Sequence, residues 1–175
     1  MPETFFIHLL KLIVFIAPIY AANTSPVFAA KTKMLEFLNI PVDFNLKLFG
    51  KPLFGSHKTI RGYVIGIFCG TFLAVYLNYF TKFWTLEQAL LFGFLVSFGS
   101  LLGDTVKSFF KRRINIEPGR DWVPFDQLDY SVGALLVSAI AIAWQWYDYC
   151  FMIGLSILLH FIANFFKRNI LKTLA

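Results

Sequence analysis

Charged residues are scarce in this sequence, since only 15% of its 175 residues are Asp, Glu, Lys or Arg, while 58% are hydrophobic. A soluble domain of this length could not bury so much apolar surface, because surface-to-volume scaling limits the core of a small globule. The composition therefore excludes an ordinary soluble protein and predicts an all-α integral membrane protein.

Other features are missing as well. The sequence has no Ser/Gly-rich linker, no low-complexity tract and no evident internal repeat, so residues 1–175 are expected to form one transmembrane domain. Its two cysteines, Cys69 and Cys150, fall at different predicted depths in the membrane, which makes a disulfide between them unfavourable.

Five apolar segments are long enough to cross the hydrocarbon core, which takes roughly 20 residues per helix. They are residues 5–30, 62–80, 86–102, 130–146 and 150–166. The first could instead be a cleaved signal peptide, but Glu3 and a single Lys11 do not make a positively charged leader region. If the segment is retained, Pro18 and Pro26 should kink or break its helix.

The basic residues predict the orientation. Of the 16 Lys and Arg residues, 14 lie in residues 31–61, in residues 103–129 and in the tail from Lys167. A five-span path places all three segments on one face, which the positive-inside rule assigns to the cytoplasm. We therefore expect a multi-pass protein of the cell membrane with its N-terminus outside, its C-terminus inside, and cytoplasmic loops at residues 31–61 and 103–129. The first loop fits short interfacial helices and ordinary loop equally well.

The second span carries Gly62, Gly66 and Gly70 at four-residue spacing. This spacing places the three glycines on one helix face and predicts close approach by a neighbouring helix.

The third span continues as a helix-compatible sequence through Arg113. Helical spacing places Asp104, Lys107, Ser108 and Lys111 on one face. The run KSFFKRR alone is typical of an anchor that binds lipid phosphates. An anchor needs only bases, however, so it does not explain the acids that share this segment.

Two further acids lie where a new helix can begin. If residues 126–129 are helical, Asp126 and Asp129 share a face with their Cβ atoms roughly 5–6 Å apart. Separately, Asp126 could be a helix cap and Asp129 an interfacial residue. Together with Asp104 on the same membrane face, the pair favours a hard-oxygen site for a divalent cation such as Mg²⁺.

A second polar motif, GSHKTIRG, spans residues 55–62. Lys58 and Arg61 supply positive charge, and Thr59 supplies a hydroxyl near a helix N-terminus, where anions are favoured. The spacing is not that of a P-loop, so alone it is a weak phosphate-site signal. Basic donors together with carboxylates for Mg²⁺ are what phosphoryl or nucleotidyl transfer requires.

These motifs resemble known ones. Gly103-Asp104, Ser108, Lys111-Arg112 and the Asp126–Asp129 pair resemble the signature of phosphatidate cytidylyltransferases, G-D-x-x-x-S-x-x-K-R followed by a Pro-Gly turn and D-R-x-D. The combination of G-x-x-K-T-x-R-G, K-R-R and P-x-D-Q-L-D is similar, more specifically, to the CDP-archaeol synthase family. Arg120-Asp121-Trp122 stands where His-Gly-Gly is usual in the phosphatidate enzymes, and Gln127 replaces the Arg of D-R-x-D, which favours the archaeol branch.

The resemblance implies transfer of CMP from CTP to a membrane lipid phosphate, with release of pyrophosphate and assistance by Mg²⁺. In archaea the lipid is digeranylgeranylglyceryl phosphate and the product is CDP-archaeol. A phosphatidate cytidylyltransferase that makes CDP-diacylglycerol is one alternative, and a non-enzymatic transporter or scaffold is another. The D-G-x-x-A-R…G-x-x-x-D-x-x-x-D pattern of CDP-alcohol phosphotransferases is not found.

We expect Asp104, Asp126 and Asp129 to be the metal ligands and to act in catalysis together with Lys111. A further set is expected to bind the nucleotide and the phosphates: Lys58, Thr59, Arg61, Gly62, Lys107, Ser108, Arg112, Arg113, Gly119 and Gln127. The expected partners are CTP, the lipid phosphate and the bilayer, with no nucleic acid. A homo-oligomer is left open.

Overall fold

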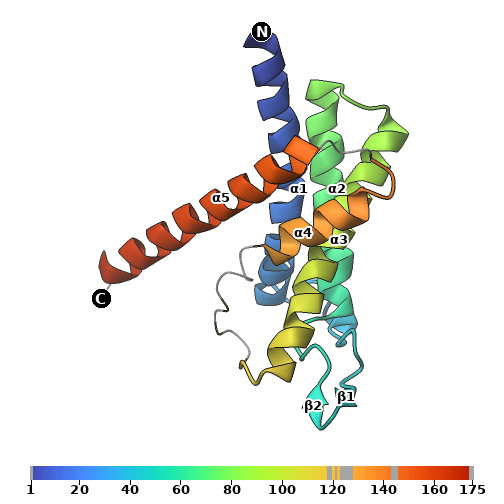
Figure 1. Cartoon of the computed structure of the whole chain (residues 1–175). Coiled ribbons are helices and arrows are strands. Elements are labelled where there is room, and N and C mark those ends of the chain that lie inside the picture. The colour runs from blue at the N-terminus through green and yellow to red at the C-terminus, as the bar shows by residue number, and fades with distance from the viewer. Residues whose placement is uncertain (1, 118–119, 121, 123–127, 143–145, 174–175) are drawn as a thin grey trace.

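The structure, a computed structural model, describes residues 2–117, 120, 122, 128–142 and 146–173. Three long helices stand side by side: α1 (Pro2–Lys31), α2 (Ile60–Thr81) and α3 (Leu86–Arg113) (Figure 1). The short helix α4 (Asp129–Ser138) lies against α3, and α5 (Trp146–Thr173) leads away from the bundle to the C-terminus. The structure therefore confirms the prediction that the protein is mainly α-helical.

The ends of the central helices follow from local sequence. Thr59 caps α2 by accepting a hydrogen bond from the Gly62 amide (3.1 Å). Thr85 and Gln88 form a reciprocal capping box at the start of α3. The last turn of α3 holds three consecutive bases, residues 111–113, which the negative end of the helix dipole favours.

Glycines set the distances between the helices. A Cβ on Gly66 would lie 2.6 Å from the carbonyl oxygen of Ala22 on α1, and one on Gly70 would lie 2.1 Å from Ser97 Oγ on α3. The predicted close packing on the glycine face of α2 is therefore confirmed. Within the bundle, Phe15 and Phe92 are fully buried and their rings are in contact.

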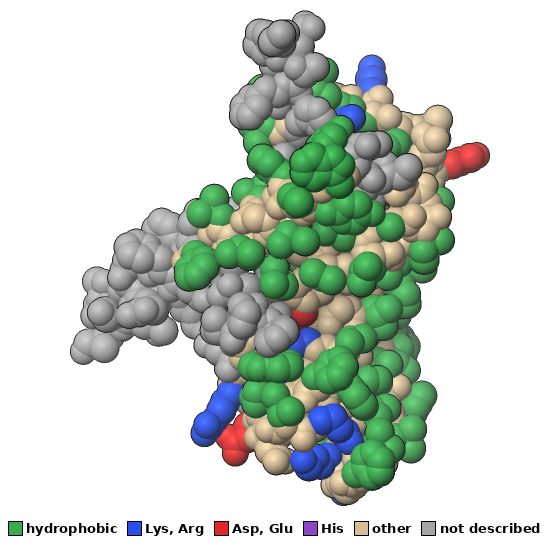
Figure 2. All heavy atoms as spheres, viewed as in Figure 1, with side chains coloured by type: hydrophobic (Ala, Val, Ile, Leu, Met, Phe, Trp, Pro, Cys, Tyr) green, Lys and Arg blue, Asp and Glu red, His purple; other side chains and the backbone are tan. Residues whose placement is uncertain are grey.

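The outer surface suits a lipid environment. Leu9–Lys31, Ile60–Thr81 and Leu86–Arg113 are each long and apolar enough to cross a membrane. Hydrophobic side chains cover the flanks of the molecule, and Lys and Arg gather at the end where α3 finishes (Figure 2). Helix α1 is continuous through Pro18 and Pro26, so these prolines do not break it, and a kink at either one remains a prediction. Neighbouring helices can compensate for prolines within a membrane bundle.

Helix α4 differs from the predicted fourth span, residues 130–146. It ends at Ser138, whose carbonyl oxygen accepts hydrogen bonds from the amides of Ala141 and Ile142 in a turn. Its 10 residues rise about 15 Å, which is half the thickness of the hydrocarbon core. Helix α4 is therefore too short to cross the membrane alone, and five crossings remain a prediction.

The connection between α1 and α2 is mostly irregular. It contains a 3₁₀ turn (Glu36–Leu38) and a small antiparallel hairpin, β1 (Lys47–Leu48) paired with β2 (Lys51–Pro52). This arrangement favours the loop interpretation of residues 31–61 over interfacial α-helices. The hairpin lies beside the C-terminal end of α3 (Figure 1).

Candidate functional site

A polar pocket of about 160 Å³ lies between the end of the α1–α2 connection and the last turns of α3. The face of α3 that helical spacing predicts lines it, through Asp104, Lys107, Ser108 and Lys111. Arg112 also lines the pocket. The sequence pattern therefore identified the α3 side of this pocket correctly.

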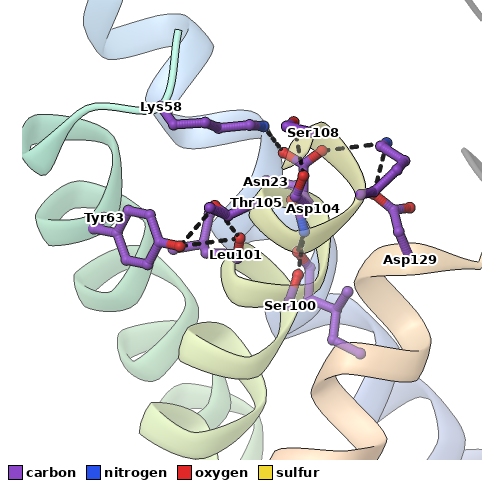
Figure 3. Close-up of polar contacts among 11 residues, drawn as sticks. Asn23, Lys58, Tyr63, Ser100, Leu101, Asp104, Thr105, Ser108 and Asp129 are labelled. Atoms are coloured by element: carbon purple, nitrogen blue, oxygen red, sulfur yellow. Dashed lines mark hydrogen bonds and ion pairs between the residues drawn. The ribbon is translucent and has the colours of Figure 1, made fainter. Parts of the chain in front are cut away.

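The GSHKTIRG motif supplies the opposite wall. Gly55, His57 and Lys58 line the pocket from this side. Lys58 extends from the residues before α2 and forms an ion pair with the carboxylate of Asp104 (Figure 3). Lys58 and Asp104, 46 residues apart in sequence, thus bring the two motifs together at one pocket.

Lys107 joins the two acids that the structure describes. Its Nζ lies 3.2 Å from Asp104 Oδ1 and 2.6 Å from Asp129 Oδ2, so one ammonium group contacts both carboxylates. Asp129 begins α4 (Figure 3). The N-terminal end of α4 packs directly on Gly103 of α3. The helix contact therefore brings Asp129 next to Asp104.

Asp129 is the more deeply buried acid, with its side chain 5% exposed compared with 28% for Asp104. Asp129 precedes the apolar part of α4 and lies outside the three candidate spans. Burial raises the pKa of Asp129 to about 6, opposed by the positive charge of Lys107 and reinforced by the negative charge of Asp104. Its buried oxygens retain unfilled hydrogen-bonding capacity among the described residues.

Hydrogen bonds within the bundle fix the α3 segment beneath the acids. The Tyr63 hydroxyl on α2 lies 2.7 Å from Thr105 Oγ1 and donates to the carbonyl oxygen of Leu101 (3.2 Å). Asn23 on α1 donates to Ser100 Oγ (Figure 3). The backbone that carries Asp104 is thus tied to both neighbouring helices.

Two predicted residues in the pocket also make internal contacts. Lys111 is buried and donates to the carbonyl oxygen of Arg120 (2.7 Å), which holds the start of the α3–α4 connection. The Ser108 hydroxyl donates to the carbonyl oxygen of Asp104 one turn earlier (2.8 Å). Both side chains still line the pocket.

Four other predicted binding residues lie outside the pocket lining. Thr59 is the cap of α2, and Gly62 packs against Pro26 of α1. Arg61 is buried and forms an ion pair with Glu36 of the 3₁₀ turn. Arg113 donates to hairpin carbonyl oxygens, including that of Pro52 (2.5 Å). In this structure the Arg61 and Arg113 side chains position the α1–α2 connection. Gly119, Asp126 and Gln127 lie outside the described residues.

Two residues outside the predicted set contribute to the site. His57 lines the pocket, and its place within GSHKTIRG was the available signal. Asp43 is buried, and its carboxylate accepts hydrogen bonds from the backbone amides of Asn45 (3.0 Å), Phe54 (2.9 Å) and Gly55 (3.3 Å). It thereby fixes the approach of the loop to Lys58. No local pattern in the sequence indicates this role.

The donor set suits a hard divalent cation. Within the described part of the chain no three His, Cys, Asp or Glu side chains come together, so Asp104 and Asp129 form a pair. Carboxylate oxygens are the ligands Mg²⁺ prefers, and it usually takes only one or two of them together with water and substrate phosphates. The pair and the unfilled hydrogen-bonding capacity of Asp129 therefore fit Mg²⁺.

The chain is similar to proteins of one known family. The sequence model described as "CarS-like: CDP-archaeol synthase" matches residues 5–172. The chain is 32% identical to the CDP-archaeol synthase of Thermococcus kodakarensis over 154 residues, covering 87% of this chain and 86% of that protein. It is 35% identical to the CDP-archaeol synthase of Thermococcus gammatolerans over 155 residues, with coverage of 87% and 86%.

A solved structure is also similar. It is described as an intramembrane enzyme for archaeal membrane lipid biosynthesis and superposes with a TM-score of 0.76 at 32% sequence identity. The match covers 89% of this chain and 94% of the other. The arrangement of helices is therefore shared over nearly the whole length of both chains.

Proposed function

The chain belongs to the CarS-like family of CDP-archaeol synthases, and we propose that its polar pocket binds CTP with Mg²⁺ beside Asp104 and Asp129 for transfer of CMP to a lipid phosphate. Membership of the family makes the protein a membrane cytidylyltransferase. The observation that carries the site assignment is that Lys107, in the wall of a pocket lined by bases, contacts both Asp104 in that wall and Asp129 next to it.

The reaction needs no general base. An oxygen of the lipid phosphate is already ionised near neutral pH, and it forms a bond to the α-phosphorus of CTP. The bond from that phosphorus to the oxygen bridging to the β-phosphorus breaks, and pyrophosphate leaves with the electron pair. Positioning and charge neutralisation therefore supply most of the catalysis.

The residues of the pocket have distinct roles in this proposal. Lys58, Lys111 and Arg112 face the triphosphate and offset its negative charge. Lys107, which reaches Asp129, is placed to contact the incoming lipid phosphate. Asp104 and Asp129 would hold Mg²⁺, which supplies Lewis-acid stabilisation of the charge that develops on the transferred group. Asp126 is a third proposed ligand.

The test uses purified protein in lipid nanodiscs, CTP labelled at the α-phosphate, and a lipid phosphate. We expect label in the lipid product, and none in it when the label is on the γ-phosphate. Asp104→Asn and Asp129→Asn should each lower kcat by roughly 10²–10³-fold, the usual cost of losing one group that stabilises transition-state charge.

Glu117→Gln is the matched control, since Glu117 lies in the connection between α3 and α4 but is 70% exposed and pairs only with the exposed Arg120 (3.2 Å) among the described residues. Its rate should stay close to that of the wild type, because exposed ion pairs contribute little. Near wild-type turnover in both aspartate variants would show that the site is assigned wrongly.

A further inference from the structure

An apolar groove runs between α3 and α4, with a volume of about 640 Å³. Its walls include Leu102, Val106 and Phe110 from α3 and Val132, Leu136 and Val137 from α4. This volume falls in the range of roughly 300–1,000 Å³ typical of small-molecule sites. An apolar ligand would be favoured here because it removes hydrocarbon surface from water or from loosely packed lipid.

The groove opens to the side of the molecule. Val106 is 46% exposed and Leu136 is 66% exposed, and each belongs to the apolar surface of its helix. Helix α3 is a candidate membrane span, so its apolar surface at this opening suits contact with lipid. A hydrocarbon chain could therefore enter from the bilayer without crossing water.

Two charged residues lie in this otherwise apolar lining, Lys107 and Asp129. Lys107 also lines the polar pocket beside Lys58 and Asp104, so the groove and the pocket meet at one lysine side chain. Figure 3 shows Asp104 and Asp129 approaching each other at this junction. A surface that only contacts bulk lipid does not need buried charged residues. Such residues are costly at membrane depth and typically mark a functional site.

The geometry points to this groove as the binding site for one hydrocarbon chain of the lipid phosphate substrate, with the phosphate of that lipid held at Lys107. This inference rests on the proposed function and adds the place and the direction of lipid entry. A ligand that is apolar along its length and anionic at one end matches both parts of the site. Val106 and Leu136, on opposite walls, then determine how broad a chain fits.

The first experiment narrows the groove. Val106→Trp and Leu136→Trp should each raise the KM for the lipid phosphate, measured as mole fraction in nanodiscs, by roughly tenfold or more, as expected for overpacking of an apolar site. The KM for CTP should change by less than about twofold, because the polar pocket is untouched. Val64→Trp is the matched control, since Val64 on α2 is 45% exposed and lies outside the groove lining.

A second experiment needs no variant. A lipid phosphate with a diazirine in its chain is photolysed with the wild-type protein in the absence of CTP, and the labelled peptides are identified by mass spectrometry. We expect label on residues 102–110 and 128–137. Unlabelled lipid phosphate should compete, whereas the same lipid with a free hydroxyl in place of the phosphate should not.

The outcomes separate the two proposals. If both Trp variants transfer CMP with an unchanged KM for the lipid phosphate, the groove is not the binding site of the lipid chain, and the proposed function still stands. Equal competition by the hydroxyl lipid would also overturn the groove as the binding site, because it would show ordinary lipid contact. Specific labelling of the groove without any CMP transfer would contradict the proposed function and support the groove.

Discussion

Replacing Gly103 with alanine should disturb the acidic pair without removing any functional side chain. A Cβ on Gly103 would lie 2.1 Å from the carbonyl oxygen of Asp129 and 3.1 Å from Cα of Gly133. Ordinary contact begins near 3.4 Å, so α4 must move away from α3 by about 1 Å. Asp129 begins α4 and would move with it.

The expected magnitude follows from that displacement. A misplacement of about 1 Å at a catalytic group can cost on the order of 100-fold in rate. Overpacking of a tight contact typically costs about 1–3 kcal/mol of stability, which a folded membrane protein can often tolerate. We therefore expect Gly103→Ala to remain folded while kcat for CMP transfer falls about 100-fold.

The assay compares initial rates of CMP transfer in identical nanodiscs, with thermal unfolding measured on the same samples. Gly154→Ala is the control, because a Cβ at Gly154 on α5 meets nothing within 4 Å. Its rate and unfolding temperature should match those of the wild type. A folded Gly103→Ala protein with an undiminished rate would refute the idea that the α3–α4 contact fixes the position of a catalytic Asp129.

Three further predictions test the loop and the metal. Asp43→Asn replaces one carboxylate oxygen, which accepts hydrogen bonds from backbone amides, with an NH₂ group that can only donate, at a cost of about 1–3 kcal/mol. The loop that carries Lys58 should then shift, and the KM for CTP should rise roughly tenfold or more although Lys58 itself is unchanged. An unaltered KM would contradict this. A lysine at position 113 cannot donate to two hairpin carbonyl oxygens at once as the Arg113 guanidinium does, so in Arg113→Lys limited proteolysis should cut the β1–β2 hairpin faster than in the wild type. Equal cutting rates would show that Arg113 does not hold the hairpin in place. Because the pKa of Asp129 is about 6 without metal, protons should compete with Mg²⁺ for its carboxylate. The Mg²⁺ concentration that gives half the maximal rate should therefore rise as pH falls from about 7.5 to 5.5. If this concentration stayed constant, Asp129 would be excluded as a ligand.

The sequence predicted the features that depend on local periodicity and composition. Low charge and long apolar runs predicted a helical membrane protein, and the spacing of Asp104, Lys107 and Lys111 predicted which face of α3 lines the pocket. The same rule of helix geometry predicted close packing at Gly66 and Gly70. These predictions succeeded because 3.6 residues per turn fixes neighbours on a helix without any other part of the chain.

Residue type alone does not determine which groups the basic side chains contact. Arg61 and Arg113 look like phosphate ligands in the sequence, yet one pairs with Glu36 and the other donates to hairpin carbonyl oxygens. A guanidinium group suits carboxylates, carbonyls and phosphates alike, so only its neighbours in space decide which it meets. The length of α4 was hidden for a similar reason, since hydropathy does not record where an apolar helix stops.

By itself, the sequence determined that this protein is a helical membrane protein with a charged face on α3, because composition and helical period are local properties. Only the tertiary structure decided that Lys58 reaches Asp104, that Lys107 joins Asp104 to Asp129, and that an apolar groove meets the polar pocket there. The contact of Lys107 with Asp129 depends on how closely α3 and α4 approach at Gly103, and helix packing sets this distance between residues far apart in the chain.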